Sequence, residues 1–247
     1  MRAWNNQRIQ SVLGGLITLT WSMTPVWAQL SAVERAPVLR YFPLTKGSYW
    51  IYEGRVRWTP VGLNVVQEEH VVIRMEVTDT YQRGPVWFAL LNGHPADAAW
   101  YEPQRLPSHG AALCVGYQVY FVDASRVPEV RRRVQDPHDR LGGLVKSSDV
   151  DFDFPLLPGK QFGETEQLTR EDVRYQWIVL SPSTVLTAIG ESVPHQSELL
   201  YETVPAHIRL RFEDGKGIVG YESVHHGTVA EAYLALKEFR ISAGDER

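Results

Sequence analysis

The chain has 247 residues, one cysteine and a formal net charge of −4 at pH 7, and 44% of its residues are hydrophobic. The acidic balance argues against nucleic acid as a partner, because nucleic-acid binding requires a basic face. The single cysteine excludes a disulfide within the chain, so a packed core must supply the stability.

Residues 1–28 have the pattern of a secretory signal peptide. The segment MRAWNNQR carries two arginines and no acidic residue, SVLGGLITLTWSM is apolar, and Val26 and Ala28 precede a cleavage position before Gln29. An uncleaved membrane anchor is the alternative, but the apolar stretch is shorter than the roughly 18 to 20 residues of a membrane span. We therefore predict an exported protein, periplasmic or secreted, with 23 basic and 29 acidic residues after cleavage, a net charge of −6.

The remaining residues, 29–247, are predicted to form a single all-β domain that is mostly antiparallel. Short runs of β-branched and aromatic residues alternate with Gly, Pro, Asn and Asp, which is typical of strands joined by turns. This spacing favours a curved sheet, a half-open barrel or a sandwich, with at most short helices. After a polar lead at 29–40, the expected strands are 48–58, 65–79, 85–91, 113–123, 172–180, 184–190, 198–202, 206–213, 217–226 and 229–241.

An element of sequence occurs twice. YFPLTKGSYWIYEG at 41–54 is echoed by FPLLPGKQFGE at 154–164, so that Trp50 corresponds to Phe162. Proline keeps the preceding residue extended, and Gly47 and Gly159 stand where the chain must turn, at positive φ. Each copy is predicted to be a corner that delivers a strand with a buried ring, in preference to a ligand-binding wall. The second copy suggests two related halves that meet near residue 145.

These corners, together with the closing segment RLRFEDGKGIVGYESVHHGTVAEAYLALKEF, resemble a broad group of uncharacterised secreted proteins and lipoproteins of bacteria. Members share an opening FPLxxGxxWxY corner and a closing GxGxV strand. The resemblance covers about a third of the chain by motif, and this chain lacks the lipobox cysteine of the lipoproteins. It implies an extracytoplasmic antiparallel β fold, and it implies no catalytic residues.

Two segments interrupt the strand pattern. Residues 92–110 contain three prolines and are expected to form a long surface loop. The candidate ligand-binding residues in this loop are Trp100, Tyr101 and Arg105. The preferred hypothesis is that the two aromatic rings fold back and cap the mouth of a barrel instead of binding a ligand. Residues 124–143 are predicted to hold one or two helical turns between Pro128 and Pro137.

Motifs for common chemistry are missing from the sequence. No G-x-S-x-G, H-E-x-x-H, P-loop or paired C-x-x-C motif occurs, and we predict no catalytic residue, no metal site and no cofactor. Asp149, Asp151 and Asp153 have calcium-loop spacing, but the EF-hand pattern fails and a solvated strand edge is favoured. Cys114 lies in an apolar strand and is expected to be buried and inert. The adjacent His225 and His226 point to opposite faces of a strand and so do not chelate one ion.

The C-terminal strands allow a register to be predicted. Asp214-Gly215 is a two-residue hairpin signal, which pairs Leu210 with Val219 and Ile208 with Tyr221. A second turn at His226-Gly227 would pair Tyr221 with Ala232, giving a three-stranded meander over 206–241. On the opposite face this register places His207, Glu222 and Glu231 in one row, which we interpret as a solvent-facing charge row in preference to a proton or metal site.

The functional hypothesis is a non-enzymatic extracytoplasmic β protein that binds an apolar or amphipathic ligand or partner. One alternative is a structural or interaction subunit of an envelope assembly, and a second is a hydrolase of unrecognised type. No nucleic acid and no integral membrane segment after signal cleavage are expected.

Overall fold

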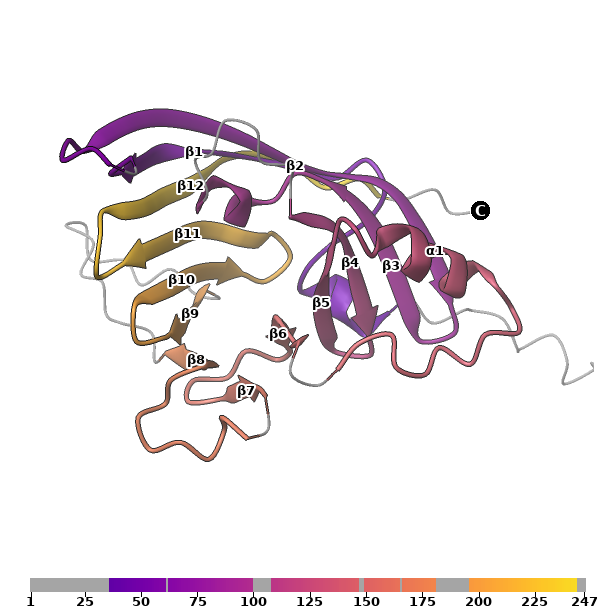
Figure 1. Ribbon diagram of the computed structural model, residues 1–247. Helices are drawn as coiled ribbons and strands as arrows, with labels where there is room; N and C mark the ends of the chain where they lie inside the picture. Colours follow the sequence, from indigo (N-terminus) through magenta and orange to yellow (C-terminus); the bar gives the residue numbers. More distant parts are fainter. Residues whose placement is uncertain are drawn as a thin grey trace, which may run out of the picture. The chain divides into compact units, whose positions relative to one another are not determined.

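The described part of the chain forms one antiparallel sheet of twelve strands (Figure 1). The computed structural model describes residues 36–60, 62–99, 108–146, 149–164, 166–180 and 196–243, which belong to one compact unit. The signal-peptide segment, the strand expected at 184–190, and Trp100, Tyr101 and Arg105 lie outside the described residues.

The strands form two six-stranded meanders that follow each other along the chain. The first comprises β1 (Tyr49–Trp58), β2 (Gln67–Arg83), β3 (Val86–Asn92), β4 (His109–Val115), β5 (Gln118–Asp123) and β6 (Phe152–Asp153). The second comprises β7 (Gln161–Gly163), β8 (Gln176–Leu180), β9 (Gln196–Glu202), β10 (Ala206–Glu213), β11 (Gly217–His225) and β12 (Ala230–Arg240). The described helices are α1 (Val127–Gln135) and the short 3-10 helices η2 (Pro37–Arg40) and η3 (Pro95–Ala99).

The two meanders are joined through β1 and β12, which pair antiparallel, and this leaves β6 and β7 at the two edges of the sheet. The sheet curls until its edge strand β6 approaches β10 across the interior. Phe152 on the edge strand β6 lies 5.2 Å, between ring centroids, from Phe212 on β10. The fold is thus mostly antiparallel β, nearly closed into a barrel, as the strand pattern predicts.

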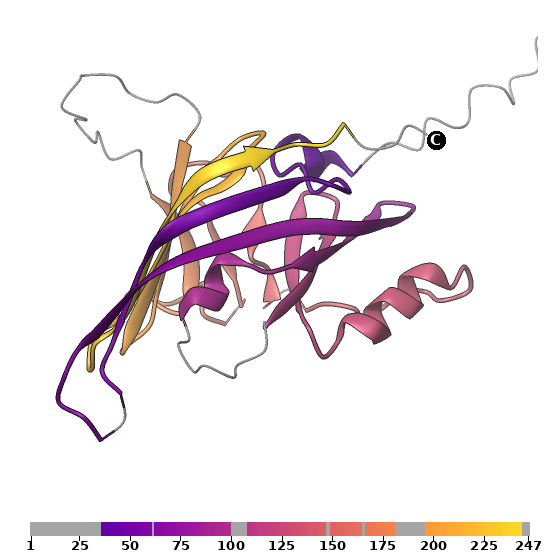
Figure 2. The same cartoon turned by 90° about the horizontal axis from the view of Figure 1, so that it is seen from above.

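Alternation along the strands separates an inner from an outer face. On β1 the inward Trp50, Tyr52 and Val56 are buried, whereas the outward positions 53, 55 and 57 carry charged side chains. This period of two is what a half-buried antiparallel strand requires. Helix α1 lies beside the first meander (Figure 2) and contacts β2 and β3, and its Val130 and Val134 are buried. The helix lies in the segment where one or two turns are predicted.

The two copies of the repeated element form equivalent corners. Gly47 and Gly159 have φ values of 84° and 82°, the left-handed region that favours glycine. Their N–H groups donate to the carbonyls of Val77 and Val179, each at 2.8 Å. Trp50 and Phe162, the rings that begin the following strands, are both buried. The prediction of a strand-delivering corner with a buried ring is therefore confirmed at both sites.

The two corners also meet in the interior. Phe42 of the first corner contacts Trp50, Phe152 and Phe212 edge to face, with ring centroids 5.6 to 6.0 Å apart. Phe154 of the second corner packs on Phe212 at 5.1 Å. Aromatic rings in these geometries fill space densely and add favourable quadrupole contacts. This cluster, named here the aromatic end, closes one end of the barrel interior.

Three segments differ from their predictions. The single strand expected at 113–123 is a hairpin of β4 and β5, because Gly116 takes a φ of 60° and reverses the chain. Residues 36–40 are not a polar lead, since η2 buries Val38 in the core. Residues 92–99 are not a surface loop, since η3 packs against β1, β2, β11 and β12.

The C-terminal meander exists as predicted, but its register is shifted by two residues. Leu210 pairs with Tyr221, not Val219, and Tyr221 pairs with Leu234, not Ala232. The first turn holds three residues instead of two, since Glu213 pairs with Gly217, and a bulge lies between Arg211 and Phe212. Because side chains alternate with a period of two, the shift of two beyond the bulge preserves the face that each residue there occupies.

Candidate functional site

The inner face of the sheet encloses a cavity of about 360 Å³ at the end opposite the aromatic end. Strands β4, β5, β8, β10, β11 and β12, the helix η3 and the residue before β6 supply its walls. The lining residues are His94, Ala96, His109, Phe121, Asp151, Trp177, Ala206, Ile208, Leu210, Tyr221, Ser223, His225 and Ala230. Most of this wall is apolar or aromatic, and the polar groups gather around His94, which precedes η3, and His109 on β4.

The cavity exists because inward side chains become smaller along the strands. On β10 the inner face carries, in order, Phe212, Leu210, Ile208 and Ala206; the first two are buried and the last two are half-buried. On β12 Leu234 is followed by Ala232 and Ala230. Between them β11 presents Tyr221 and then the small Ser223, so space remains that the aromatic end does not have.

His94 lies in the cavity wall through a tight turn before η3. The preceding Gly93 has a φ of 77°, and a Cβ there would lie 2.3 Å from the carbonyl oxygen of Arg74, so only glycine allows this approach to β2. His94 is 4% exposed. Its Nδ1 accepts a hydrogen bond from the N–H of Ala96 at 3.1 Å, whereas its Nε2 has no hydrogen-bond partner among the described residues.

The protonation state of His94 follows from this environment. Burial lowers its pKa well below the ordinary value, the charge of His109 lowers it further, and Asp97 opposes both. The ring is therefore neutral, and because Nδ1 accepts, the proton belongs on Nε2. A buried donor without an acceptor costs about 1 to 3 kcal/mol, so a group that accepts from Nε2 would remove this penalty.

Asp97, Ser108 and His109 form a connected polar group beside His94. The backbone N–H and hydroxyl of Ser108 both donate to Asp97 Oδ1, at 3.0 and 2.7 Å. His109 Nδ1 lies 2.9 Å from the Ser108 hydroxyl and 3.4 Å from Asp97 Oδ1. Burial raises the pKa of Asp97, but hydrogen bonds from His109 and Ser108 outweigh it and lower the pKa to about 2. Asp97 is therefore ionised and orients the imidazole of His109.

Asp151 contributes a third polar group to the cavity. Its Oδ2 accepts from the N–H of Phe121 at 2.7 Å. Burial raises its pKa to about 7 against this hydrogen bond and the charge of His109, and Asp149 adds to the rise. The solvated strand edge predicted for the three aspartates is therefore wrong for Asp151, because β6 is so short that the residue before it turns into the interior.

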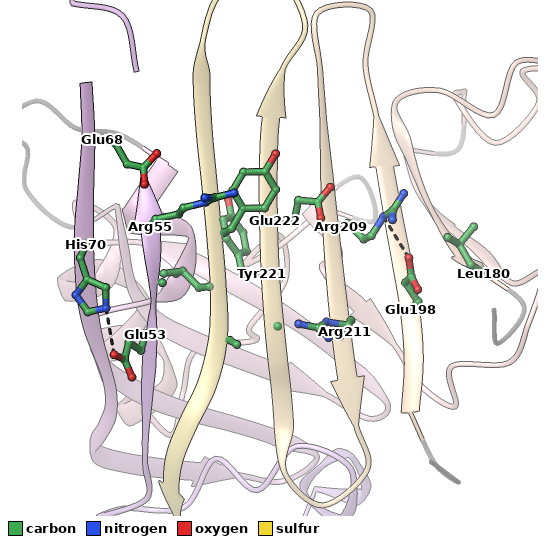
Figure 3. Close-up of a pocket in the computed structure, with 15 residues that line it drawn as sticks. Glu53, Arg55, Glu68, His70, Leu180, Glu198, Arg209, Arg211, Tyr221 and Glu222 are labelled. Carbon is green, nitrogen blue, oxygen red and sulfur yellow. Dashed lines mark hydrogen bonds and ion pairs between the residues drawn. The ribbon is translucent and has the colours of Figure 1, made fainter. Parts of the chain in front are cut away.

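A larger depression of about 950 Å³ lies on the outer face of β1, β2 and β8–β12 (Figure 3). Its side chains largely satisfy one another. Arg209 pairs with Glu198 at 3.1 Å, and His70 pairs with Glu53 at the same distance. Exposed ion pairs of this kind contribute about 0 to 1 kcal/mol each and describe a solvated surface.

The predicted charge row is only partly assembled on this outer face. His207 Nε2 lies 2.9 Å from Glu222 Oε1, and its Nδ1 lies 3.1 Å from His226. Glu231, however, pairs with Arg57 at 2.8 Å and lies opposite Val224, not Glu222. The prediction that Glu222 and Glu231 face each other across strands is wrong, since the two-residue register shift places Tyr233 opposite Glu222. The residues form separate ion pairs.

The adjacent histidines lie on opposite faces, as their strand positions predict. His225 lines the inner cavity, where its Nδ1 accepts from the N–H groups of Gly227 and Thr228 at 3.1 Å, while His226 contacts His207 outside. Within the described ranges, no three His, Cys, Asp or Glu side chains are grouped so as to hold a metal ion.

Sequence reasoning did not identify His94, Asp97 and Asp151. A signal for His94 was available in NGHPAD at 92–97, where a glycine and a proline flank a histidine and mark a tight turn. The partnership of His94 with His109 had no such signal, because 15 residues separate them and η3 must fold inward before they meet. Cys114 is buried as predicted, and burial raises the pKa of its thiol.

Comparison with known proteins found no family model that matches the chain, no matching curated protein and no matching solved structure. In the part of the chain that the structure describes, no helix has the length and apolar character needed to cross a membrane. Inference about function therefore depends on the cavity and on the sequence itself.

Proposed function

We propose that the protein is a non-enzymatic, exported β protein that binds an apolar or amphipathic small molecule in the inner cavity. The observation that carries the proposal is the loss of large inward side chains toward one end of an otherwise packed interior. A cavity of about 360 Å³ with apolar walls and a few convergent polar groups has the size and character of small-molecule sites. The signal-peptide pattern of residues 1–28 and the resemblance to bacterial secreted proteins support export.

The state of the possible nucleophiles supports a binding function over hydrolysis. The hydroxyl of Ser108 donates to Asp97, so it does not present its proton to His109 as an activated serine would. The thiol of Cys114 is fully buried, and burial raises its pKa, which disfavours the reactive thiolate.

The inner cavity is favoured over the outer depression because of desolvation. Outer side chains such as Arg209 and Glu198 already have partners and contact water. A ligand there would have to displace both water and ion-pair partners, whereas the inner wall offers Phe121, Trp177 and Leu210. Burial of apolar surface yields roughly 25 cal/mol per Å², so an apolar ligand gains most inside.

The test is titration of the purified chain with N-phenyl-1-naphthylamine, a neutral apolar fluorophore, combined with native mass spectrometry. Ile208→Trp places a large ring in the cavity and is expected to weaken dye binding at least tenfold. Val72→Trp is the matched control, because Val72 is exposed on the outer face of β2, and it should leave dye binding unchanged.

Two results would overturn the proposal. One is no dye binding by the unmodified chain together with no co-purifying small mass. The other is equal binding by both tryptophan variants. A clean monomer that instead retains a protein partner in a pull-down would favour the structural or interaction subunit, and turnover in a broad substrate screen would favour the hydrolase.

A further inference from the structure

The polar end of the cavity has a defined pattern of hydrogen-bond donors and acceptors. His94 presents Nε2–H as a buried donor without a partner among the described residues, since its Nδ1 is occupied by the N–H of Ala96. This donor belongs to a side chain that lines the cavity and is 4% exposed. An apolar ligand alone would leave it unsatisfied.

His109 presents the complementary group. The single hydroxyl proton of Ser108 is used on Asp97 Oδ1, so the contact between Ser108 Oγ and His109 Nδ1 requires the proton to be on Nδ1. In the tautomer with the proton on Nδ1, Nε2 carries a lone pair on the side away from Asp97. The rings of His94 and His109 lie 4.4 Å apart between centroids, tilted by 34°. A donor and an acceptor therefore stand side by side.

We propose that this histidine pair binds a hydroxyl group, and that the ligand of the cavity is a neutral amphiphile with an alcohol head. The hydroxyl oxygen accepts from His94 Nε2–H, and the hydroxyl proton is donated to His109 Nε2. The apolar body then lies against Trp177, Ile208 and Leu210. This inference rests on the proposed function, because it names the ligand class of the same cavity.

Charged head groups fit this end less well. A carboxylate would accept from His94 but would lie near the carboxyl groups of Asp97 and Asp151, in a site that excludes water, and like charges repel strongly there. An ammonium group would meet the carboxylates, but it has only donors and would leave the N–H of His94 without an acceptor. A hydroxyl group, unlike either ion, supplies both a donor and an acceptor without a charge to desolvate.

The experiment measures displacement of N-phenyl-1-naphthylamine by three ligands of equal chain length: 1-decanol, decanoate and decylammonium. The unmodified chain is expected to bind 1-decanol at least tenfold more tightly than either ion at pH 7.5. His94→Phe keeps a ring of similar size without the donor, and it should weaken 1-decanol binding about tenfold more than it weakens dye binding. His70→Phe, the same change on the outer face, is the matched control and should alter neither.

Tighter binding of decanoate or decylammonium than of 1-decanol would overturn the alcohol assignment, as would unchanged 1-decanol binding by His94→Phe. In both cases the dye still binds, so the proposed function survives. A failure of the dye to bind the unmodified chain would instead remove the proposed function itself. The ranking of head groups on the unmodified chain decides the question even if His94→Phe does not fold.

Discussion

The two ends of the barrel interior are built from the same strands but differ in what they contain. At the aromatic end, Phe42, Trp50 and Phe212 are fully buried and interlock edge to face. At the cavity end, the same inner face of β10 continues with Ile208 and Ala206, and the space between the walls stays open. One end stabilises the fold, and the other can be specialised for a ligand without loss of the core.

The polar groups follow the same division. Of the five described buried side-chain atoms without a hydrogen-bond partner, His94 Nε2 and Asp97 Oδ2 lie beside the cavity, both amide atoms of Gln176 lie on β8, and Arg209 Nε lies on β10. Two buried side chains of the aromatic end have partners. There, Trp50 Nε1 donates to the carbonyl of Lys216 at 2.5 Å, and the Tyr52 hydroxyl donates to the carbonyl of Ile218 at 3.0 Å. Unsatisfied buried groups are uncommon in native proteins and concentrate where function requires them.

The largest expected effect is on the aromatic end. Phe212→Ala should lower the free energy of unfolding by about 3 to 5 kcal/mol, because the rings around it cannot close the cavity that it leaves. Ile208→Ala, on the same face of β10, should cost less than about 1.5 kcal/mol, since Ile208 already borders open space. Urea unfolding of both variants measures the difference. Equal losses would show that the two ends are packed alike.

The next effect is a pH dependence at the cavity end. The pKa of Asp151 is raised in the folded state to about 7, so between about pH 4 and 7 the folded protein binds more protons than the unfolded chain. The contribution of Asp151 to the free energy of unfolding is fully present below about pH 4 and is lost as the pH rises through 7. Between pH 5 and 8 the unmodified chain should lose roughly 3 kcal/mol more than Asp151→Asn.

His109 and Asp149 also influence this carboxyl group, so the comparison with the variant is needed to isolate its titration. Unfolding free energies at the two pH values supply it. Parallel pH profiles for the two proteins would show that Asp151 titrates normally and that the cavity end is open to bulk water.

A smaller effect of opposite sign is expected at Asp97. Its pKa is lowered to about 2, so its contribution is present above about pH 4 and is lost as the pH falls toward 2. Asp97→Asn should therefore lower the free energy of unfolding by about 2 kcal/mol at pH 7, and the gap should narrow at pH 3. A gap that is unchanged at pH 3 would mean that the loss comes from packing and not from charge.

The smallest effect is expected from filling the cavity. Ile208→Trp should change the free energy of unfolding by less than about 1 kcal/mol, since the larger ring enters open space, whereas Leu44→Trp at the aromatic end should cost at least about 1 to 3 kcal/mol by overpacking. Thermal unfolding of both variants tests this. If Ile208→Trp is the more damaging change, the cavity end is closed in solution.

Much of the fold could be predicted from local pattern. Alternating strand residues identified most strands within a few residues, because the period of two is a local property of extended chains. The repeated corner could also be predicted from the sequence, since proline and glycine determine the backbone conformation at their own positions and next to them. The predicted register of β10 to β12 was wrong by two residues, because turn length and the position of a bulge depend on how the partner strands pack. The alternation of apolar and polar residues does not distinguish two registers that differ by an even number of residues.

The sequence by itself determined the antiparallel β class, the two corners with buried Trp50 and Phe162, and the existence of the C-terminal meander. Only the tertiary structure decided that η3 folds inward, that His94 meets His109, and that Asp151 borders a cavity. These contacts join segments that no local periodicity relates, and they form only once the curled sheet brings β4 and the residue before β6 opposite β8 and β10. The sheet closes through contacts between residues that are far apart in the sequence, and the candidate site forms only when it closes.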